Sequence, residues 1–183
     1  MLVFMLAAAP GQAAKLEGQR FDDTLRMADK TLLLNGLGLR GVAWIKAFVA
    51  GLYLPTRSTD AAQILRMPGP KRLRLQMLME ASSQELSKAV RRGVSKNETP
   101  AAQQALADRV AQFNRSVDAV GTLRKGDALD VDYLPGQGTL LRFNGKAMGV
   151  PIPGDDFYQT LLKIFIGDRP VDNRLKEGLL SGR

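Results

Sequence analysis

The order in which strand-like and helix-like segments follow one another is the strongest constraint on the fold of this chain. Two adjacent amphipathic helices are predicted in the middle, one after the capping box Ser82-x-x-Glu85 and one that starts at Thr99. Strand-like segments precede and follow this pair, and a final pair of helices closes the chain. This order lacks the regular strand–helix alternation of a doubly wound sheet. It therefore predicts an α+β fold with a mainly antiparallel sheet on which the helices pack.

The segment Val42–Leu54 is long, apolar and rich in β-forming residues, and it ends at Pro55. We predict a central strand that is covered on both faces, with Gly51 at a bulge or a close approach. The preceding Gly36-x-Gly-x-x-Gly41 run predicts a bend where the backbone passes close to another element. Its spacing matches the dinucleotide-binding fingerprint, but the residues that follow are strand-like and do not open a helix. We therefore do not assign it to a nucleotide.

Composition limits the chemistry that the chain can perform. A length of 183 residues, 45% of them hydrophobic, suits one well-buried domain. The chain has no cysteine and no histidine, which excludes disulfides, serine–histidine and cysteine–histidine catalysis, and the usual zinc and copper ligands. We expect no metal and no organic cofactor.

Residues 1–14 carry no charge, run from apolar to small, and offer Gly11-x-Ala13 as a cleavage site. They resemble the end of a secretory signal peptide whose basic start is missing, and a disordered or strand-forming N-terminus is the alternative. The predicted domain then spans residues 15–183, in a periplasmic or otherwise exported protein, and we expect a monomer. The leader is too short to span a bilayer, and no later segment reaches transmembrane length.

The net charge of +8 is spread over the chain. A basic net charge of this kind is typical of proteins that bind nucleic acid, anionic lipid or an acidic small ligand. No long basic run or aromatic-interleaved strand is present, so a nucleic-acid surface is not predicted. Asp130 and Asp132 fall on the outer face of an alternating strand, and we interpret them as solvated edge charges.

Arg40 stands between glycines just before the apolar segment, which places a cation at the edge of the core. A salt bridge to one of the acidic residues is an equally good interpretation. On the predicted strand, Lys46 and Phe48 share one face and Tyr53 lies on the other. Because an unpaired lysine is costly to bury, Lys46 is expected either to extend to the edge or to face a wet cavity.

Four segments taken together resemble the chalcone isomerase superfamily, and most of all its bacterial chalcone-isomerase-like branch. These segments are Gly38-Leu-Arg-Gly41, the run from Ile45 to Leu54, the run from Gly126 to Tyr133, and Ile164-Phe-Ile-Gly-Asp-Arg-Pro-Val-Asp-Asn-Arg-Leu-Lys176. The resemblance covers nearly the whole chain after the predicted leader. It implies an open-faced sandwich, in which a large antiparallel sheet carries helices on one face and a ligand cleft lies between them.

In the plant isomerases that the resemblance points to, a cleft arginine steers a phenolate into attack on an enone. Two threonines, a tyrosine and an asparagine assist it, and Arg40 matches the arginine. The other four positions match apolar residues or glycine in this sequence: Phe48 and Ile164 for the threonines, Leu86 for the tyrosine and Gly93 for the asparagine. Since cyclisation needs a placed proton path as well as a cation, these replacements argue against flavonoid isomerisation.

Other members of the superfamily resemble fatty-acid-binding proteins, in which the same arginine holds a carboxylate. Our hypothesis from the sequence is an exported protein that binds a small amphipathic carboxylic acid, with Arg40 on the anion and Phe48, Leu86 and Ile164 around the tail. Tyr53 or Lys46 would assist if its face turns inward. The alternatives are an isomerase or lyase that uses Arg40 as electrophile, and a structural or partner-binding protein whose cleft is filled by side chains.

Overall fold

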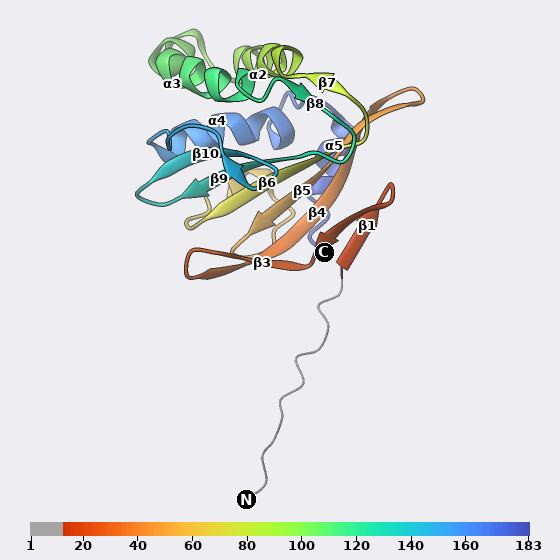
Figure 1. Cartoon of the computed structure of the whole chain (residues 1–183). Helices are drawn as coiled ribbons and strands as arrows, with labels where there is room; N and C mark the ends of the chain where they lie inside the picture. The colour runs from red at the N-terminus through yellow and green to blue at the C-terminus, as the bar shows by residue number, and fades with distance from the viewer. Residues whose placement is uncertain (1–12) are drawn as a thin grey trace, which may run out of the picture.

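A computed structural model describes residues 13–183, and a seven-stranded antiparallel sheet is its largest element (Figure 1). The strand order is β11-β10-β9-β6-β5-β4-β3, and every neighbouring pair is antiparallel. The strands are β3 (Thr24–Met27), β4 (Lys30–Val42), β5 (Ile45–Leu54), β6 (Lys71–Met77), β9 (Ala128–Leu134), β10 (Gly138–Phe143) and β11 (Lys146–Ala147). Two short pairs stand apart from this sheet: β1 (Ala13–Leu16) with β2 (Gln19–Asp22), and β7 (Ala81–Ser82) with β8 (Thr122–Leu123).

The described part of the chain also forms five helices, and the longest three lie over one face of the sheet (Figure 1). They are α1 (Ala61–Arg66), α2 (Ser83–Asn97), α3 (Pro100–Asp118), α4 (Asp155–Ile166) and α5 (Asn173–Leu179). The predicted starts of α2 and α3 are confirmed: the hydroxyls of Ser82 and Thr99 accept hydrogen bonds from the backbone N–H groups of Glu85 and Ala102. The predicted α+β architecture is confirmed as well. No helix within residues 13–183 is long and apolar enough to cross a membrane.

The leader predicted over residues 1–14 stays a prediction, because residues 1–12 lie outside the described part of the chain. Ala13 and Ala14 belong to β1, where they pair with Asp22 and Phe21.

The glycine run does not bend the chain. β4 continues through it to Val42, and the reversal into β5 falls at Ala43 and Trp44. The close approach predicted there is real: a Cβ on Gly36 would lie 2.2 Å from the carbonyl oxygen of Gly178 in α5. The glycines therefore let α5 pack directly on the backbone of β4, and one long predicted strand over residues 42–54 is replaced by a hairpin.

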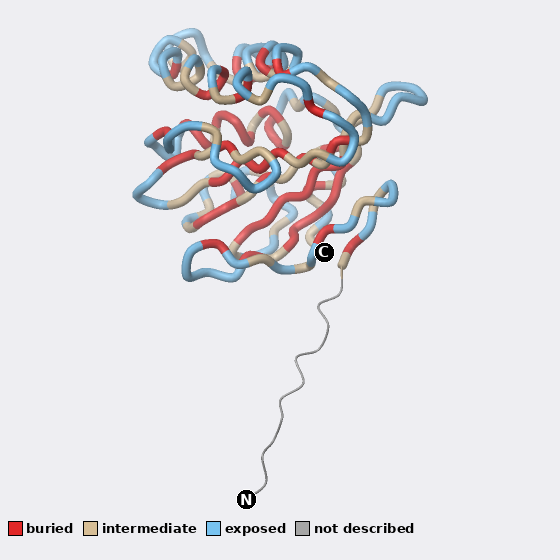
Figure 2. Tube along the Cα trace, viewed as in Figure 1, coloured by how far each residue is buried: buried red, intermediate tan, exposed pale blue. Residues whose placement is uncertain are grey.

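From Val49 to Leu54, both faces of β5 are buried, as predicted for a central strand (Figure 2). Ala50 and Leu52 join the core under the helices, whereas Val49 and Tyr53 join a second core on the opposite face. The second core includes Phe21 of the β1–β2 hairpin, whose ring packs on Gly51. The predicted close approach at Gly51 is therefore confirmed.

The prediction of solvated carboxylates on β9 is wrong. Asp130 and Asp132 are 2% and 3% exposed. Arg74 donates two hydrogen bonds to Asp130, at 2.7 and 2.8 Å, and Arg72 donates two to Asp132, at 2.6 and 2.7 Å. The neighbouring strand β6 thus supplies the counter-charges, a cross-strand pairing that the alternation along β9 alone does not reveal.

We expect Asp132→Ala to lower the free energy of unfolding by about 3 kcal/mol, because the largely buried guanidinium of Arg72 loses both of its hydrogen bonds and keeps only a 3.6 Å contact with Asp130, while Arg142 loses its carboxylate partner. Lys88→Ala removes an exposed ion pair with Glu85 and should change stability much less. Denaturant unfolding followed by circular dichroism measures both variants. Equal effects would contradict a structural role for the buried pair.

Candidate functional site

A cavity of about 460 Å³ lies between the helices and the sheet. Its walls come from five strands of the large sheet and from α2, α3 and α4, and its volume is typical of a small-molecule site. Its lining is mostly apolar and includes Phe48, Leu73, Leu75, Met77, Leu86, Val90, Phe113, Val117, Leu129, Val131, Leu161, Ile164 and Phe165.

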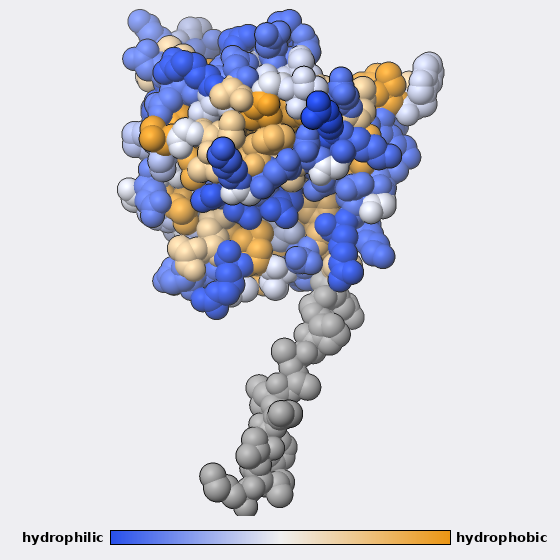
Figure 3. All heavy atoms as spheres, viewed as in Figure 1, coloured by the Kyte–Doolittle hydropathy of each residue, from blue (hydrophilic) through white to orange (hydrophobic). Residues whose placement is uncertain are grey.

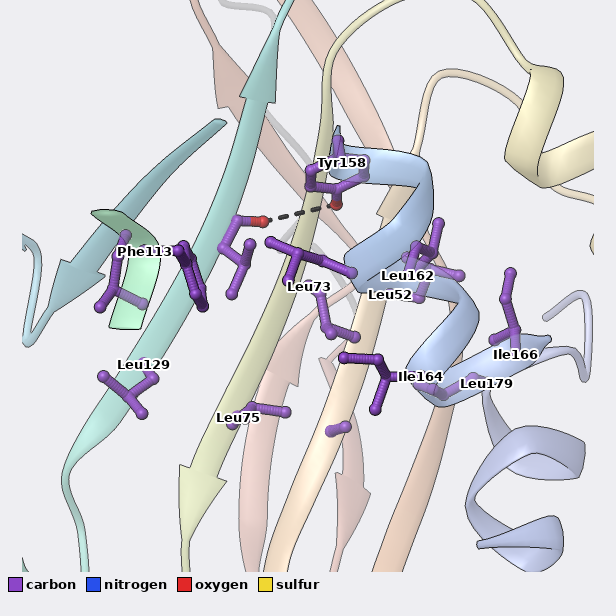
Figure 4. Close-up of a cluster of buried hydrophobic side chains, with 14 of the residues drawn as sticks. Leu52, Leu73, Leu75, Phe113, Leu129, Tyr158, Leu162, Ile164, Ile166 and Leu179 are labelled. Carbon is purple, nitrogen blue, oxygen red and sulfur yellow. Dashed lines mark hydrogen bonds between the residues drawn. The ribbon is translucent and has the colours of Figure 1, made fainter. Parts of the chain in front are cut away.

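The helices and the sheet present apolar side chains toward each other around this cavity. Figure 4 shows Leu73, Leu75 and Leu129 on the strands and Ile164 on α4, together with the hydroxyl of Tyr158, which donates to the carbonyl oxygen of Val131 at 3.4 Å. Burial raises the pKa of Tyr158 well above its usual value. The phenol therefore stays neutral, and its proton is already engaged by the sheet.

Among residues 13–183, Arg40 is the only cation whose side chain lines the cavity. It pairs across the hairpin with Phe48, and because directly paired residues point to the same face, both face the helices. The Arg40 side chain is 27% exposed and so lies at the opening of the cavity.

The guanidinium of Arg40 is held by one side of its fork. Its Nη1 donates to Oδ2 of Asp172 at 3.1 Å and to the carbonyl oxygen of Gly41 at 3.4 Å. The other carboxylate oxygen of Asp172 accepts the backbone N–H of Leu175 and caps α5. Neither Nε nor Nη2 of Arg40 has a hydrogen-bond partner among residues 13–183, so one edge of the guanidinium is available to a ligand.

Two carboxylates also line the opening. Glu80 and Glu85 are both exposed, and a hydrogen bond from Lys88 lowers the pKa of Glu85. Within the described residues, no group of three acidic side chains is arranged as metal ligands. The arrangement is thus an apolar chamber with a single guanidinium and two carboxylates at its opening.

The family model for chalcone isomerase-like proteins matches residues 13–181. This chain belongs to the chalcone isomerase-like family. No curated protein sequence matches the chain. Among solved structures, a fatty-acid binding protein from Arabidopsis thaliana is similar, with a TM-score of 0.73 and 14% sequence identity over 92% of this chain and 96% of that chain. At that identity the likeness establishes the shared chalcone isomerase-like fold.

Four of the six residues named from the sequence lie together in the chalcone isomerase-like cavity. Arg40, Phe48, Leu86 and Ile164 all line it. Gly93, which matches the family's asparagine, lies under Ile164: a Cβ at this position would come 2.6 Å from the isoleucine side chain. Phe48, Leu86 and Ile164 are apolar, and they form part of the apolar wall of the cavity.

Lys46 and Tyr53 are not brought to the cavity. Ala47 is an extra residue between the paired positions Arg40–Phe48 and Gly41–Lys46, so Lys46 lies outside the cavity and its Nζ donates to Glu17 at 2.6 Å. Tyr53 faces the second core, where its hydroxyl donates to the carbonyl oxygen of Asp22 and burial raises its pKa to about 12. Neither side chain can assist a ligand beside Arg40.

The sequence did not identify Asp172 as the partner of Arg40. The two residues are 132 positions apart in the chain, and the sequence does not show that they meet. The remaining wall residues lie on apolar faces of strands and helices. Periodicity identifies which face is apolar, but it does not show whether the opposing faces touch.

If the cavity is not filled by side chains, a larger side chain on its wall should fit into the empty space. We expect Leu75→Phe, on the cavity wall, to change the free energy of unfolding by less than about 1 kcal/mol, whereas Leu52→Phe should cost about 2 kcal/mol. Leu52 is a matched control because it is fully buried on the same face of the sheet and does not line the cavity. Equal costs in denaturant unfolding would show that side chains fill the space.

Proposed function

We propose that this protein binds a small amphipathic carboxylic acid of the fatty-acid type, with the carboxylate on Arg40 and the tail in the apolar chamber. The observation that carries the proposal is the arrangement at the opening: one guanidinium with an unused edge beside a chamber of otherwise apolar character. A guanidinium edge suits a carboxylate because its N–H donors are spaced to meet two oxygens. The fold shared with a fatty-acid binding protein supports the same assignment.

Asp172 sets how strongly Arg40 attracts a ligand. Its carboxylate already neutralises part of the guanidinium charge and fixes the guanidinium through Nη1. The ligand head is therefore oriented by hydrogen bonds from Nε and Nη2, while burial of the tail supplies most of the free energy of binding. A ligand with one anionic group fits best, since Glu80 and Glu85 at the opening repel a second one.

We favour binding over isomerisation because the described lining of the cavity offers few groups that could transfer a proton to a ligand. Of the side chains that line it, the ionisable ones are Arg40, Glu80, Glu85 and Tyr158. The tyrosine proton is engaged by Val131, and both glutamates are exposed to solvent. An enone cyclisation needs a proton donor or an ordered water beside the reacting atoms, and among residues 13–183 the chamber offers Arg40 alone for that role.

We also infer that the protein is exported and acts in the periplasm or outside the cell. The uncharged apolar-to-small pattern of residues 1–14 supports this inference. Mass spectrometry of the protein recovered from a periplasmic extract tests it through the mass of the mature N-terminus. Recovery of the uncleaved chain in the cytosolic fraction alone would contradict export.

Arg40→Ala should remove a bound acid. We expect native mass spectrometry of the wild-type protein, purified without detergent, to show an adduct of fatty-acid mass, and we expect the adduct to be lost in Arg40→Ala. Arg91→Ala, an exposed change on α2 outside the cavity, should keep it. In titrations, wild type should prefer an acid over the alcohol of the same chain length, and Arg40→Ala should lose that preference. Equal binding of both ligands to wild type would contradict a carboxylate anchor.

Asp172→Asn should strengthen acid binding severalfold. The change removes the negative charge that competes for Arg40, and asparagine remains a good N-cap for α5. Isothermal titration calorimetry with the acid and with the matching alcohol measures the effect. The alcohol should bind Asp172→Asn and wild type equally, and an equal gain for both ligands would indicate a change in the chamber and not at the guanidinium.

A further inference from the structure

The β4–β5 hairpin ends in an apolar tip that is exposed to solvent. The hairpin tip, residues 42–45, carries Val42, Trp44 and Ile45, which are 62%, 87% and 49% exposed. Figure 1 shows the hairpin projecting beyond the body of the protein, and Figure 3 shows hydrophobic residues just behind its outermost end. A tryptophan at this exposure, between two exposed aliphatic residues, contributes little to the folded core.

The hairpin tip is continuous with the opening of the cavity. Val42 and Ile45 line the cavity as well as the outer surface, and Arg40 lies only two residues before the tip. Met79 and Val171, also exposed, extend the apolar rim on the side of the helices. A tail that leaves the chamber therefore passes along side chains that already face solvent.

We propose that the hairpin tip inserts into the surface of a phospholipid bilayer that contains anionic lipid, and that the bound acid exchanges between bilayer and chamber there. Tryptophan prefers the membrane interface, and small aliphatic side chains beside it add apolar area. Lys46 follows the tip directly and stays half exposed although it is paired with Glu17, and the net charge of +8 attracts an anionic surface. The exchange step rests on the proposed function, whereas the docking step does not.

The shape of the tip favours a bilayer over a protein partner. A two-residue turn that stands out from the body offers a small convex contact, whereas stable protein interfaces bury more than about 1,000 Å². A bilayer surface deforms around such a tip and needs no matching shape.

The sequence supplies its own reporter, because Trp44 is the only tryptophan in the chain. We expect its fluorescence to move to shorter wavelength, and its quenching by acrylamide to fall, when vesicles of phosphatidylglycerol and phosphatidylcholine are added. Vesicles of phosphatidylcholine alone should produce a smaller change, and raised salt should weaken binding to the anionic vesicles. No spectral change at high anionic lipid would overturn the proposal. A shift that grows with protein concentration without lipid would do so too, since it would assign the tip to a second copy of the chain.

Trp44→Ser should weaken co-sedimentation with anionic vesicles by about tenfold or more. Val150→Ser is the matched control: it is an exposed aliphatic residue outside the cavity lining, beyond β11 at the opposite edge of the sheet, and it should bind vesicles as wild type does. Equal binding by the two variants would overturn the role of the tip.

Binding of a soluble short-chain acid, measured without vesicles, separates the two proposals. Trp44→Ser should bind that acid as wild type does, because Trp44 does not line the cavity. Acid binding without vesicle binding would overturn the docking proposal and leave the proposed function intact. Vesicle binding without acid binding would support docking and overturn the exchange step together with the proposed function.

Discussion

The close packing of α5 on the backbone of β4 determines where the charged groups of the site lie. A Cβ on Gly38 would stand 2.3 Å from the carbonyl oxygen of Leu175, so this contact requires glycine. Once α5 is seated, its N-cap Asp172 lies beside Arg40 near the end of the same strand. The helix position, the orientation of the guanidinium and its free edge thus depend on a strip of β4 without side chains.

The two faces of the sheet have different roles, and the cavity lies on the face toward the helices. The face toward β1–β2 is closed by Phe21 and Tyr53 and by the buried arginine–aspartate pairs, and these contacts hold the strands in register. On the other face, the helices close over β5 at Leu52 but leave a space near Phe48 and Leu75. Stability and ligand access are therefore supplied by different faces of one sheet.

Much of the fold could be predicted because its determinants are local. Capping residues located α2 and α3, and alternation located β9. The errors came from contacts between distant segments. The partners of Asp130 and Asp132 lie on another strand, β6. The glycines of β4 are needed because α5, a helix near the C-terminus, packs against their backbone. In the site, Arg40, Phe48, Leu86 and Ile164 were foreseen through the family resemblance. Of the two positions expected for Lys46, the structure has the exposed one, because one extra residue at Ala47 shifts the alternation of β5.

The central claim is that Arg40 holds the carboxylate of a bound acid, and the NMR signal of that carboxylate tests it most directly. A fatty acid labelled with ¹³C at the carboxyl carbon would be bound to the wild-type protein and to Arg40→Met and followed as the pH is lowered. The bound carboxylate should stay ionised to lower pH in wild type than in the variant, because the guanidinium favours the charged form. Identical titrations in the two proteins would contradict an anchor at Arg40.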